Sequence, residues 1–373
     1  MKKLFSRSPK PRSQPDYTFI IIVCLLVIFG LVMLASASSD IAKEEFGNSY
    51  YYLSHQVIYG LSFGIIGFIL GSLIYYNKWK NFAIFLLGLN MIAMALVFTP
   101  LGISAKGASR WLDLGLFSFQ PSEILKLTFL IYISSWMSKN KKRGRSFMEG
   151  ALPFLLLLGG VLGLIFFQPA TTTAVIIFVA AIIMYFASGA KIKYIGMIFL
   201  LALTMFSLLI VSSPYRLDRV KTFLNPAENQ LGESYQINQS LIAIGSGGLT
   251  GVGYGKSTTK INYLPEPIGD SIFAVIAEEL GFVGSVLLIS LFISFFWRGF
   301  YIARKSSDPF GKILVIGFIS IITLQAFVNM GAMSGLLPLT GVPLPFISYG
   351  GTALAVFLIM CGIIINVSRY SKN

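Results

Sequence analysis

Long apolar runs, separated by short polar segments, make up most of the chain. A helix of about 20 apolar residues is long enough to cross the hydrocarbon core of a membrane. Ten runs approach this length, and they lie at 18–36, 54–75, 82–99, 122–138, 150–167, 171–188, 194–212, 271–296, 311–333 and 348–367. Because backbone polar groups in lipid must be satisfied within the chain, the pattern predicts an all-α, polytopic membrane protein with about ten transmembrane helices.

Composition agrees with the apolar runs. Of the 373 residues, 55% are hydrophobic and only 12% are charged, whereas soluble domains carry about 25% charged residues. The first 16 residues are basic and rich in Pro and Ser, and they predict a disordered cytoplasmic tail before a transmembrane domain at 17–373. The longest polar segment, at about 213–270, lies between the seventh and eighth predicted spans.

The distribution of basic residues orients the chain in the membrane. If the N-terminus is cytoplasmic and the spans alternate, 20 of the 29 Lys and Arg residues lie inside, with only three of the 15 Asp and Glu residues. Because an excess of Lys and Arg marks cytoplasmic loops, we expect a cytoplasmic-membrane protein with both termini in the cytoplasm. The net charge of +14 then suits anionic lipid headgroups and does not indicate nucleic-acid binding.

A glycine-rich segment, GSGGLTGVGYGKS at residues 245–257, superficially resembles a nucleotide-binding loop. A Walker A loop needs a glycine where the chain has Thr250, and a dinucleotide fingerprint starting at Gly251 needs one where it has Lys256. The segment also belongs to the long outer loop, where no ATP pool is expected. It is therefore either a loop without a ligand or a site for a phosphate carried by a lipid or an exported molecule, with Lys256 as a cation.

Cysteine and histidine residues point to no metal or redox chemistry. Cys24 and Cys361 lie within apolar spans and are expected to be packing residues. His55, the only histidine, begins a span at the outer surface and is expected at the membrane interface. No metal-ligand cluster is predicted, and a Ser/His/Asp or Cys/His hydrolase is disfavoured.

Charged residues inside the fourth predicted span need an explanation, because a charge in an apolar span is costly. Pro121 suits the first turn of a helix, and Glu123 and Lys126 follow at a spacing of i, i+3 on one face. One interpretation is a mutual ion pair between Glu123 and Lys126. The other is that Lys126, with Arg110 just before the span, presents cations to an anionic headgroup.

A second polar stretch, YLPEPIGDSIFAVIAEELGFVG at 263–284, carries several carboxylates. Asp270 precedes the eighth span, where it is either a helix N-cap or a residue that lines a polar cavity. Glu278 and Glu279 lie deeper and diverge by about 100°, so one of them is expected to pack against a polar partner. Carboxylates beside a loop that holds two lysines favour acid/base chemistry next to an anion site.

Other outer segments favour the same kind of ligand. GLLPLTGVPLPFISYGG at 335–351 is rich in Pro and Gly, and it predicts either a plain turn or a non-helical loop that lines a cavity. YRLDRVKTFLNP at 215–226 is a basic patch, and ESYQINQSLIAIGSGG at 233–248 predicts an amphipathic helix at the membrane surface. A lipid with a phosphorylated headgroup would fit all of these features.

Three long motifs resemble those of the SEDS family (shape, elongation, division and sporulation). They are GASRWLDLG with FQPSE, QSLIAIGSGGLTGVGYGKS with YLPE and FAVIAEELGFVG, and PLPFISYGG, and they occur in the family's order over nearly the whole chain. YRLDRVKTFLNP and GYGKSTTKINYLPEP are more similar to the division branch, FtsW, than to the elongation branch, RodA. LTGVPLPF lacks the Lys-Gly that FtsW proteins often carry there, which leaves RodA open.

The resemblance implies a peptidoglycan glycosyltransferase that polymerises lipid II on the outer face of the cytoplasmic membrane. Its partners would be a class B penicillin-binding protein and other division proteins. The resemblance assigns the catalytic role to Asp270 and substrate binding to Arg110, Glu123 and Lys126.

This chain departs from the family pattern at two places. The family commonly has TDF at 269–271, where this chain has Gly-Asp-Ser, and QPD at 168–170, where it has Gln-Pro-Ala. The first departure alters the surroundings of the expected catalytic carboxylate. The second indicates that the missing carboxylate is not essential in this chain or that its activity is reduced.

The residues and the resemblance together predict a reaction. Asp270 is expected to act as general base on the 4-hydroxyl of the acceptor sugar, which attacks the anomeric carbon of the donor. Arg110 and Lys126 would bind the leaving pyrophosphate, and Lys256, Ser348 and the glycine-segment amides are further candidates for headgroup binding. No cofactor is required by the pattern, although Mg²⁺ or Mn²⁺ could assist. A lipid II flippase and a non-catalytic scaffold are the alternatives.

Overall fold

The computed structural model describes residues 10–105, 108–113, 115, 118–140, 143–168, 170–212, 214–224 and 233–371. Its α-helices are α1 (Tyr17–Phe46), α2 (Tyr51–His55), α3 (Ser62–Leu73), α4 (Trp79–Leu96), α5 (Pro121–Ser138), α6 (Leu152–Phe167), α7 (Thr171–Ala187), α8 (Ile192–Val211), α9 (Pro214–Leu224), α10 (Glu233–Ser246), α11 (Thr259–Asn262), α12 (Ile272–Lys305), α13 (Pro309–Met333) and α14 (Gly351–Arg369). Short π and 3-10 helices are η1 (Gln56–Leu61), η2 (Tyr76–Lys78), η3 (Arg143–Arg145) and η4 (Phe147–Ala151), and the strands are β1 (Gly102–Ala105), β2 (Ala108–Asp113) and β3 (Ser118–Phe119).

Most of the helices have the length and composition of membrane spans. Within the described ranges, eight helical segments are long and apolar enough to cross a membrane: α1, the continuous helix from α2 to α3, η2 with α4, η4 with α6, α8, α12, α13 and α14. The other two predicted spans are also helical, namely α5, which carries Glu123 and Lys126, and α7, which has 17 residues. The prediction of an all-α, multi-pass membrane protein is confirmed.

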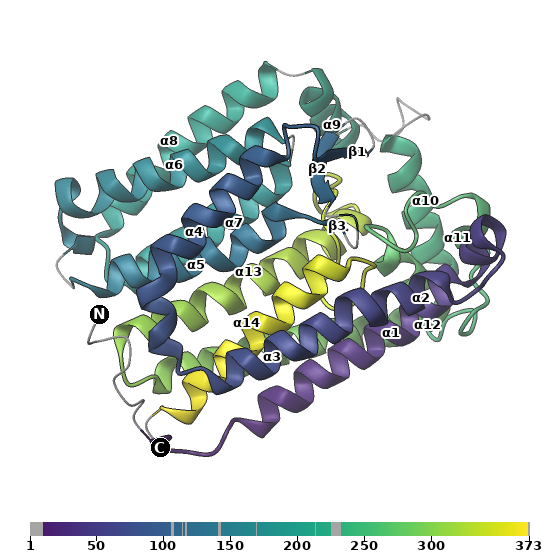
Figure 1. Cartoon of the computed structure of the whole chain (residues 1–373). Helices are drawn as coiled ribbons and strands as arrows, with labels where there is room; N and C mark the ends of the chain where they lie inside the picture. Colours follow the sequence, from purple (N-terminus) through teal and green to yellow (C-terminus); the bar gives the residue numbers. More distant parts are fainter. Residues whose placement is uncertain are drawn as a thin grey trace.

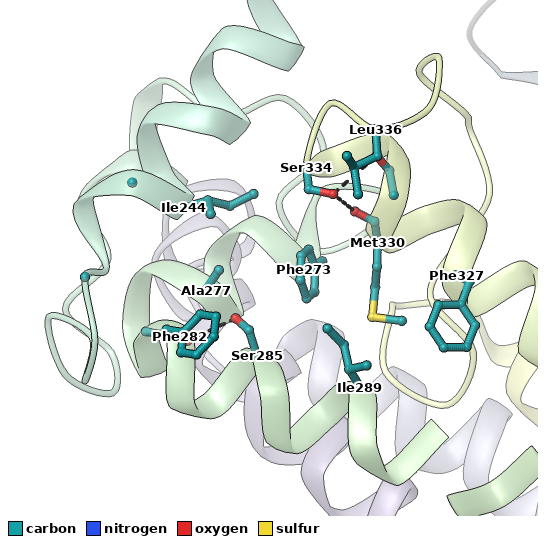
Figure 2. Close-up of a pocket in the computed structure, with 14 residues that line it drawn as sticks. Ile244, Phe273, Ala277, Phe282, Ser285, Ile289, Phe327, Met330, Ser334 and Leu336 are labelled. Atoms are coloured by element: carbon teal, nitrogen blue, oxygen red, sulfur yellow. Dashed lines mark hydrogen bonds between the residues drawn. The ribbon is translucent and has the colours of Figure 1, made fainter. Parts of the chain in front are cut away.

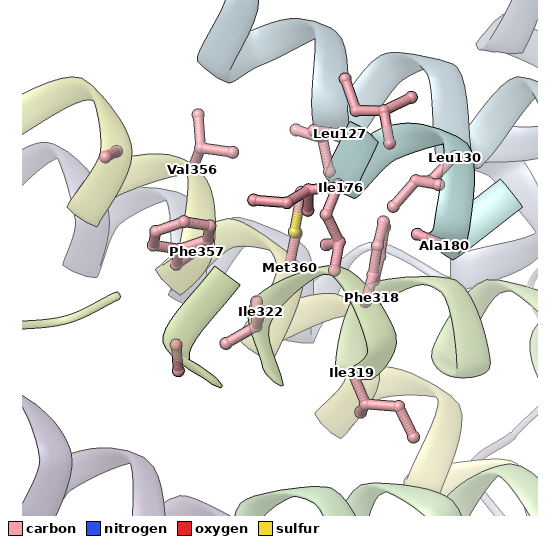
Figure 3. Close-up of a cluster of buried hydrophobic side chains, with 14 of the residues drawn as sticks. Leu127, Leu130, Ile176, Ala180, Phe318, Ile319, Ile322, Val356, Phe357 and Met360 are labelled. Carbon is pink, nitrogen blue, oxygen red and sulfur yellow. The ribbon is translucent and has the colours of Figure 1, made fainter. Parts of the chain in front are cut away.

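The centre of the bundle is formed by α13 and α14, most of whose residues are buried, whereas α8 is exposed along nearly its whole length. Side chains from α5 and α7 pack onto these two central helices (Figure 3). The cluster includes Leu127, Leu130, Ile176, Phe318 and Phe357. Because Lys126 directly precedes Leu127 on α5, this apolar cluster supports a charged residue of the candidate site.

Both ends of the described chain lie at one end of the bundle, and the strands, α10 and α11 lie at the opposite end (Figure 1). Arg12 N and Ser13 N donate to Arg369 O at 2.9 and 3.1 Å, and so use a carbonyl that the last turn of α14 leaves unpaired. The prediction of a disordered tail is therefore wrong for residues 12–16, while residues 1–9 lie outside the described chain. Because both ends of the described chain lie at the same end of the bundle, the chain crosses the bundle an even number of times.

The hydropathy pattern does not predict the three short strands between α4 and α5. β1 pairs with β2 and β2 pairs with β3, both antiparallel, and the register shifts between Ile103 and Ser104. Strands of two to six residues offer too few alternations for periodicity to reveal them. The sheet holds the segment that carries Arg110, which lies on β2.

Helix α12 is interrupted at Gly281, whose backbone angles (φ 67°, ψ −162°) lie outside the helical region. The glycine-rich segment 247–255, here called the glycine strap, pairs with the backbone groups on both sides of this break. The four bonds are Val252 N to Glu278 O (3.0 Å), Gly253 N to Glu279 O (3.1 Å), Phe282 N to Gly248 O (2.9 Å) and Val283 N to Leu249 O (3.1 Å). The amides of residues 252 and 253 therefore hold α12, and they do not form the phosphate cradle that the sequence allows.

Close backbone contact explains why the strap is rich in glycine. A Cβ atom on Gly251 would lie 2.1 Å from Glu279 O, and one on Gly247 would lie 2.0 Å from Ala277 O. Gly251 also has a φ of +81°, a conformation that glycine adopts at little cost. The glycine pattern thus records the packing of the strap on α12.

A buried ion pair joins the residues after the strap to α1 and α12. Lys260 Nζ lies 2.9 Å from Glu279 Oε1 and donates to Ser36 O at 3.0 Å. Lys260 is 2% exposed and Glu279 is 0% exposed. The neighbouring Glu278 instead accepts from Thr258 N at 3.1 Å. The sequence predicts a polar partner for one of the two glutamates, and in the structure both have one.

Replacing Gly251 by alanine (Gly251→Ala) is expected to destabilise the protein by more than about 1 kcal/mol, because the new methyl group collides with the backbone of α12 at a positive φ. Gly245→Ala is the matched control, since its Cβ would meet nothing within 4 Å and its position on α10 is helical. Thermal unfolding in detergent measures both. Equal melting temperatures for the two variants would contradict the packing role of the strap.

Lys260→Met is expected to destabilise the protein by about 3 kcal/mol or more, because it leaves the Glu279 carboxylate buried without its cation. Lys256→Met removes an exposed lysine four residues earlier and is expected to change stability by less than about 0.5 kcal/mol. The same unfolding measurement compares them. A melting temperature for Lys260→Met equal to that of Lys256→Met would show that the buried pair contributes nothing.

Candidate functional site

Asp270 lies in a tight turn directly before α12. Gly269 N and Ser271 N both donate to Glu266 O, at 3.0 and 3.2 Å, and Ser271 Oγ donates to Pro265 O at 2.7 Å. Ser271, and not Asp270, occupies the N-cap position of α12. The side chain of Asp270 is half-buried, and it precedes the end of α12 that lies away from the chain termini, since Arg298 near the other end of α12 donates to Asp16 at the start of α1. The backbone of Asp270 is thus fixed by the turn, as expected for a carboxylate that must be held in place.

The non-helical segment 334–350, here called the α13–α14 connection, lies against this turn. Ser348 Oγ donates to Gly269 O at 2.7 Å and accepts from Leu344 N at 2.7 Å. A Cβ atom on Gly341 would lie 3.5 Å from Asp270 Oδ2. The prediction of a non-helical segment is confirmed. Because the only hydrogen of the Ser348 hydroxyl is already used, Ser348 could contact a headgroup only as an acceptor.

Lys126 and Glu123 form a buried ion pair on α5. Lys126 Nζ lies 2.6 Å from Glu123 Oε2 and donates to Gln325 Oε1 of α13 at 2.7 Å. The ammonium group also lies 5.0 Å from the ring centroid of Phe357, within the range of a cation–π contact. Lys126 is 1% exposed and Glu123 is 4% exposed. Of the two sequence interpretations, the mutual ion pair describes this geometry.

Arg110 is held beside the junction of α6 and α7. Its Nε donates to Gln168 O at 3.1 Å, and Gln168 Nε2 donates to Met94 O at 3.0 Å. Gln168 is buried and Arg110 is half-buried. Ala170, where the family commonly has a carboxylate, is buried two residues after Gln168, and Pro169 lies outside the described residues.

Lys256 lies apart from these residues. It is exposed, and it follows the glycine strap, which is bonded to α12 at Glu278 and Glu279. Those glutamates are about 12 Å farther along the helix axis than Asp270. The structure therefore brings Asp270 and Ser348 together, and Glu123 and Lys126 together, but it places Lys256 in a separate segment.

An aromatic group borders the α13–α14 connection on the other side. Tyr349 Oη lies 2.8 Å from His55 Nδ1, and Tyr349 N donates to Ile268 O at 2.8 Å. Burial raises the pKa of Tyr349 to about 12, so its phenol stays protonated near neutral pH. Gln56, on the π-helical turn η1, accepts from Gly350 N at 3.0 Å. π-helical turns of this kind are frequent at functional sites.

Three buried amide side chains were not singled out from the sequence, although they contact the site. They are Gln56, Gln325 and Asn329, which are 1%, 1% and 0% exposed. Gln325 and Asn329 lie one helical turn apart in an otherwise apolar span. Polar residues inside a span are costly unless they face a partner, so this spacing was the signal that could have identified them.

A cavity of about 580 Å³ lies between α10, α12 and α13 (Figure 2). It is lined mainly by apolar side chains, including Phe273, Ile289 and Met330. Its two hydroxyl groups donate to helix carbonyls, Ser285 to Gly281 O at 3.0 Å and Ser334 to Met330 O at 2.8 Å. Such a lining suits hydrocarbon and does not suit an anionic group.

Among the described residues, no three His, Cys, Asp or Glu side chains gather in a group that could hold a metal ion. A second carboxylate lies at the turn that carries Asp270, since a Cβ atom on Gly269 would lie 3.5 Å from Glu266 Oε2. The chemistry that these residues support directly is proton transfer at Asp270 and charge stabilisation by Arg110 and Lys126.

Comparison with known proteins identifies relatives over nearly the full length. Residues 16–373 match the cell cycle protein family of FtsW, RodA and SpoVE. Stage V sporulation protein E of Bacillus subtilis (strain 168) is 38% identical over 362 residues, which cover 97% of this chain and 99% of that protein. A protein of Geobacter sp. (strain M18) named "Probable peptidoglycan glycosyltransferase FtsW" is 37% identical over 359 residues, with 96% and 98% covered.

Two solved structures share the fold. One, described as "Structural coordination of polymerization and crosslinking by a peptidoglycan synthase complex", has a TM-score of 0.80 and 26% identity over 95% of this chain and 98% of that one. The other, the rod shape determining protein RodA of Thermus thermophilus, has a TM-score of 0.71 and 26% identity over 96% and 98%. With the motifs, the bundle and these matches in agreement, the chain belongs to the SEDS family of cell cycle proteins that includes FtsW, RodA and SpoVE.

Proposed function

We propose that this protein is a peptidoglycan glycosyltransferase that polymerises lipid II during septal cell-wall synthesis, as an FtsW-like enzyme. The observation that carries the proposal is Asp270, a half-buried carboxylate in a fixed turn directly before α12. The FtsW-like assignment is supported by relatives: those named FtsW or stage V sporulation protein E are 36–38% identical, whereas Thermus thermophilus RodA is 26% identical.

The reaction joins two lipid-linked sugars. Asp270 accepts the proton of the acceptor's 4-hydroxyl as its oxygen forms a bond to the anomeric carbon of the donor. The bond between that carbon and the pyrophosphate oxygen breaks, and the lipid pyrophosphate leaves with the electron pair. A single displacement of this kind inverts the anomeric centre. Every step uses groups that the protein and two substrate molecules supply.

The leaving pyrophosphate needs positive charge, and Arg110 and Lys126 are the proposed sources. Arg110 is half-buried, and its Nε is oriented by Gln168 O at 3.1 Å. Lys126 is buried, so it would act through its electrostatic potential or by exchanging a partner with the substrate. A divalent cation, Mg²⁺ or Mn²⁺, would supply further charge neutralisation, and Asp270 is the residue that would hold it.

The proposed membrane orientation places Asp270 on the outer face, with both termini in the cytoplasm. The ends of the described chain lie at one end of the bundle (Figure 1), and in the predicted topology the segments on the side of the termini carry 20 of the 29 basic residues. The proposed partners are lipid II, a class B penicillin-binding protein that cross-links the product, and other division proteins. The solved relative described as part of a peptidoglycan synthase complex supports a partnership of this kind.

Asp270→Asn is expected to lower lipid II polymerisation by about 100-fold or more, because a neutral amide cannot accept the proton. Purified protein, with its cognate transpeptidase, would be assayed for glycan strands on gels. Asp218→Asn is the control, since it removes an exposed carboxylate on α9 and is expected to keep full activity. Equal strands from Asp270→Asn would exclude Asp270 as the base. Transfer of lipid II across vesicle membranes without strands, or no activity at all in the intact complex, would favour a flippase or a scaffold.

A second test separates the structural and chemical roles of the ion pair. Glu123→Leu and Lys126→Met are each expected to destabilise the protein by about 3–5 kcal/mol, because each leaves one buried charge unpaired. The double variant is expected to regain stability, since two apolar groups replace the pair, but not polymerisation. Melting temperatures and strand synthesis measure the two effects. A stable double variant with full activity would show that Lys126 has no part in the chemistry.

A further inference from the structure

Three consecutive backbone carbonyl groups precede α12, and each accepts a hydrogen bond from α13 or the α13–α14 connection. The bonds run from Tyr349 N to Ile268 O (2.8 Å), from Ser348 Oγ to Gly269 O (2.7 Å) and from Asn329 Nδ2 to Asp270 O (2.8 Å). Donors to irregular backbone near a membrane are needed for stability wherever they lie. The bond to Asp270 O differs from the other two, because its donor, Asn329 Nδ2, also donates to a second carbonyl group.

Asn329 uses one amide group to hold both sides of the candidate site. Its Nδ2 donates to Asp270 O and to Val342 O, each at 2.8 Å, and the residue is 0% exposed. Val342 follows Gly341, where a Cβ atom would lie 3.5 Å from Asp270 Oδ2. The two hydrogens of a planar amide point in fixed directions. Asn329 therefore sets the separation between Asp270 and the backbone that faces its carboxylate.

Gln325, one turn earlier on α13, extends the same arrangement to the buried cation. Its Nε2 donates to Pro343 O at 2.8 Å, and its Oε1 accepts from Lys126 Nζ at 2.7 Å. Residues four apart on a helix lie on one face. Two side chains on one face of α13 therefore make two bridges. Gln325 connects Lys126 to Pro343, and Asn329 connects Asp270 to Val342. The backbone of Asp270 and the Lys126 ammonium group are therefore linked, through Asn329 and Gln325, to two adjacent residues of the connection, Val342 and Pro343.

We propose that Asn329 is a positioning residue, which fixes the Asp270 carboxylate relative to the Lys126 ammonium group for the glycosyl transfer. The inference rests on the proposed role of Asp270, and it assigns Asn329 no contact with substrate. A positioning role acts on the chemical step, because small displacements of a base cost rate even when substrate still binds. A purely structural role would lower the stability of the protein without a selective effect on turnover.

The test measures kcat and KM for lipid II polymerisation with Asn329→Ala, in the full chain with its transpeptidase. We expect kcat to fall by about 10- to 100-fold, with KM within about twofold of wild type. Asn366→Ala is the matched control, because Asn366 is also 0% exposed and donates to Ser72 O at 2.6 Å, near the opposite end of the bundle. It is expected to lower stability while leaving kcat within about twofold.

Three results would overturn the proposal: an unchanged kcat in Asn329→Ala, a change in KM alone, or an equal loss of kcat in Asn366→Ala. If Asn329→Ala does not fold, Ser348→Ala removes the neighbouring bond to Gly269 O and is expected to lower kcat, and Ser348→Thr, which keeps the hydroxyl, is expected to restore it. Failure of that pair would overturn the proposal as well. Asp270→Asn in the same assay separates the two inferences. An inactive Asp270→Asn with a fully active Asn329→Ala refutes only the positioning role, whereas an active Asp270→Asn refutes the role of Asp270 as base.

Discussion

Backbone groups within a membrane protein have no water to bond in the apolar region, so every departure from helix must be paired inside the chain. This constraint organises the end of the bundle that carries Asp270. The break of α12 at Gly281 exposes backbone groups, and the glycine strap pairs with them. The turn before α12 exposes three carbonyls, and α13 with the α13–α14 connection supplies their donors. The irregular segments are therefore fixed, which is what a catalytic carboxylate requires.

The two buried lysines show the same constraint applied to charge. Lys126 is paired with Glu123 within α5, and Lys260 is paired with Glu279 across two segments. Each also bonds to a neighbouring helix, Lys126 to Gln325 of α13 and Lys260 to Ser36 of α1. A buried ion pair is weak evidence for added stability, but it strongly disfavours any packing in which one partner is lost. The bonds from the two lysines to α13 and α1 thus help to specify which helices lie side by side.

Much of the fold could be predicted from the sequence, because a membrane span is recognised from the apolar composition of about 20 consecutive residues. All ten predicted runs are helical. The amphipathic helix predicted at 233–248 is present as α10 (Glu233–Ser246). The strands that carry Arg110 could not be predicted, since two to six residues give no usable period. The helix ends were also missed where polar turns extend a span, as in α1, which continues to Phe46 beyond the predicted end at 36.

The candidate site was only partly predictable. Glu123 and Lys126 lie on one helix at a spacing of i, i+3, and this spacing alone predicts that their side chains can pair. Asp270 was identified by its motif, but its turn is held by Asn329 and Ser348, which lie 59 and 78 positions away along the chain. The glycines of the strap allowed two interpretations, because close packing on a helix and a phosphate cradle select the same residue, and the close approach of Gly247 and Gly251 to α12 accounts for those two by packing. Patterns along one segment do not specify which distant segment it meets.

The hydrogen bonds from Arg12 and Ser13 to Arg369 join the start of the first span to the end of the last. The two ends of the described chain are therefore adjacent. If they were joined and the chain were cut at another loop on the same side, each helix would keep its neighbours. A chain joined in this way has no inherent first helix. The fold alone then does not determine which face of the membrane receives Asp270, and that choice is left to the uneven distribution of Lys and Arg between the two sets of loops.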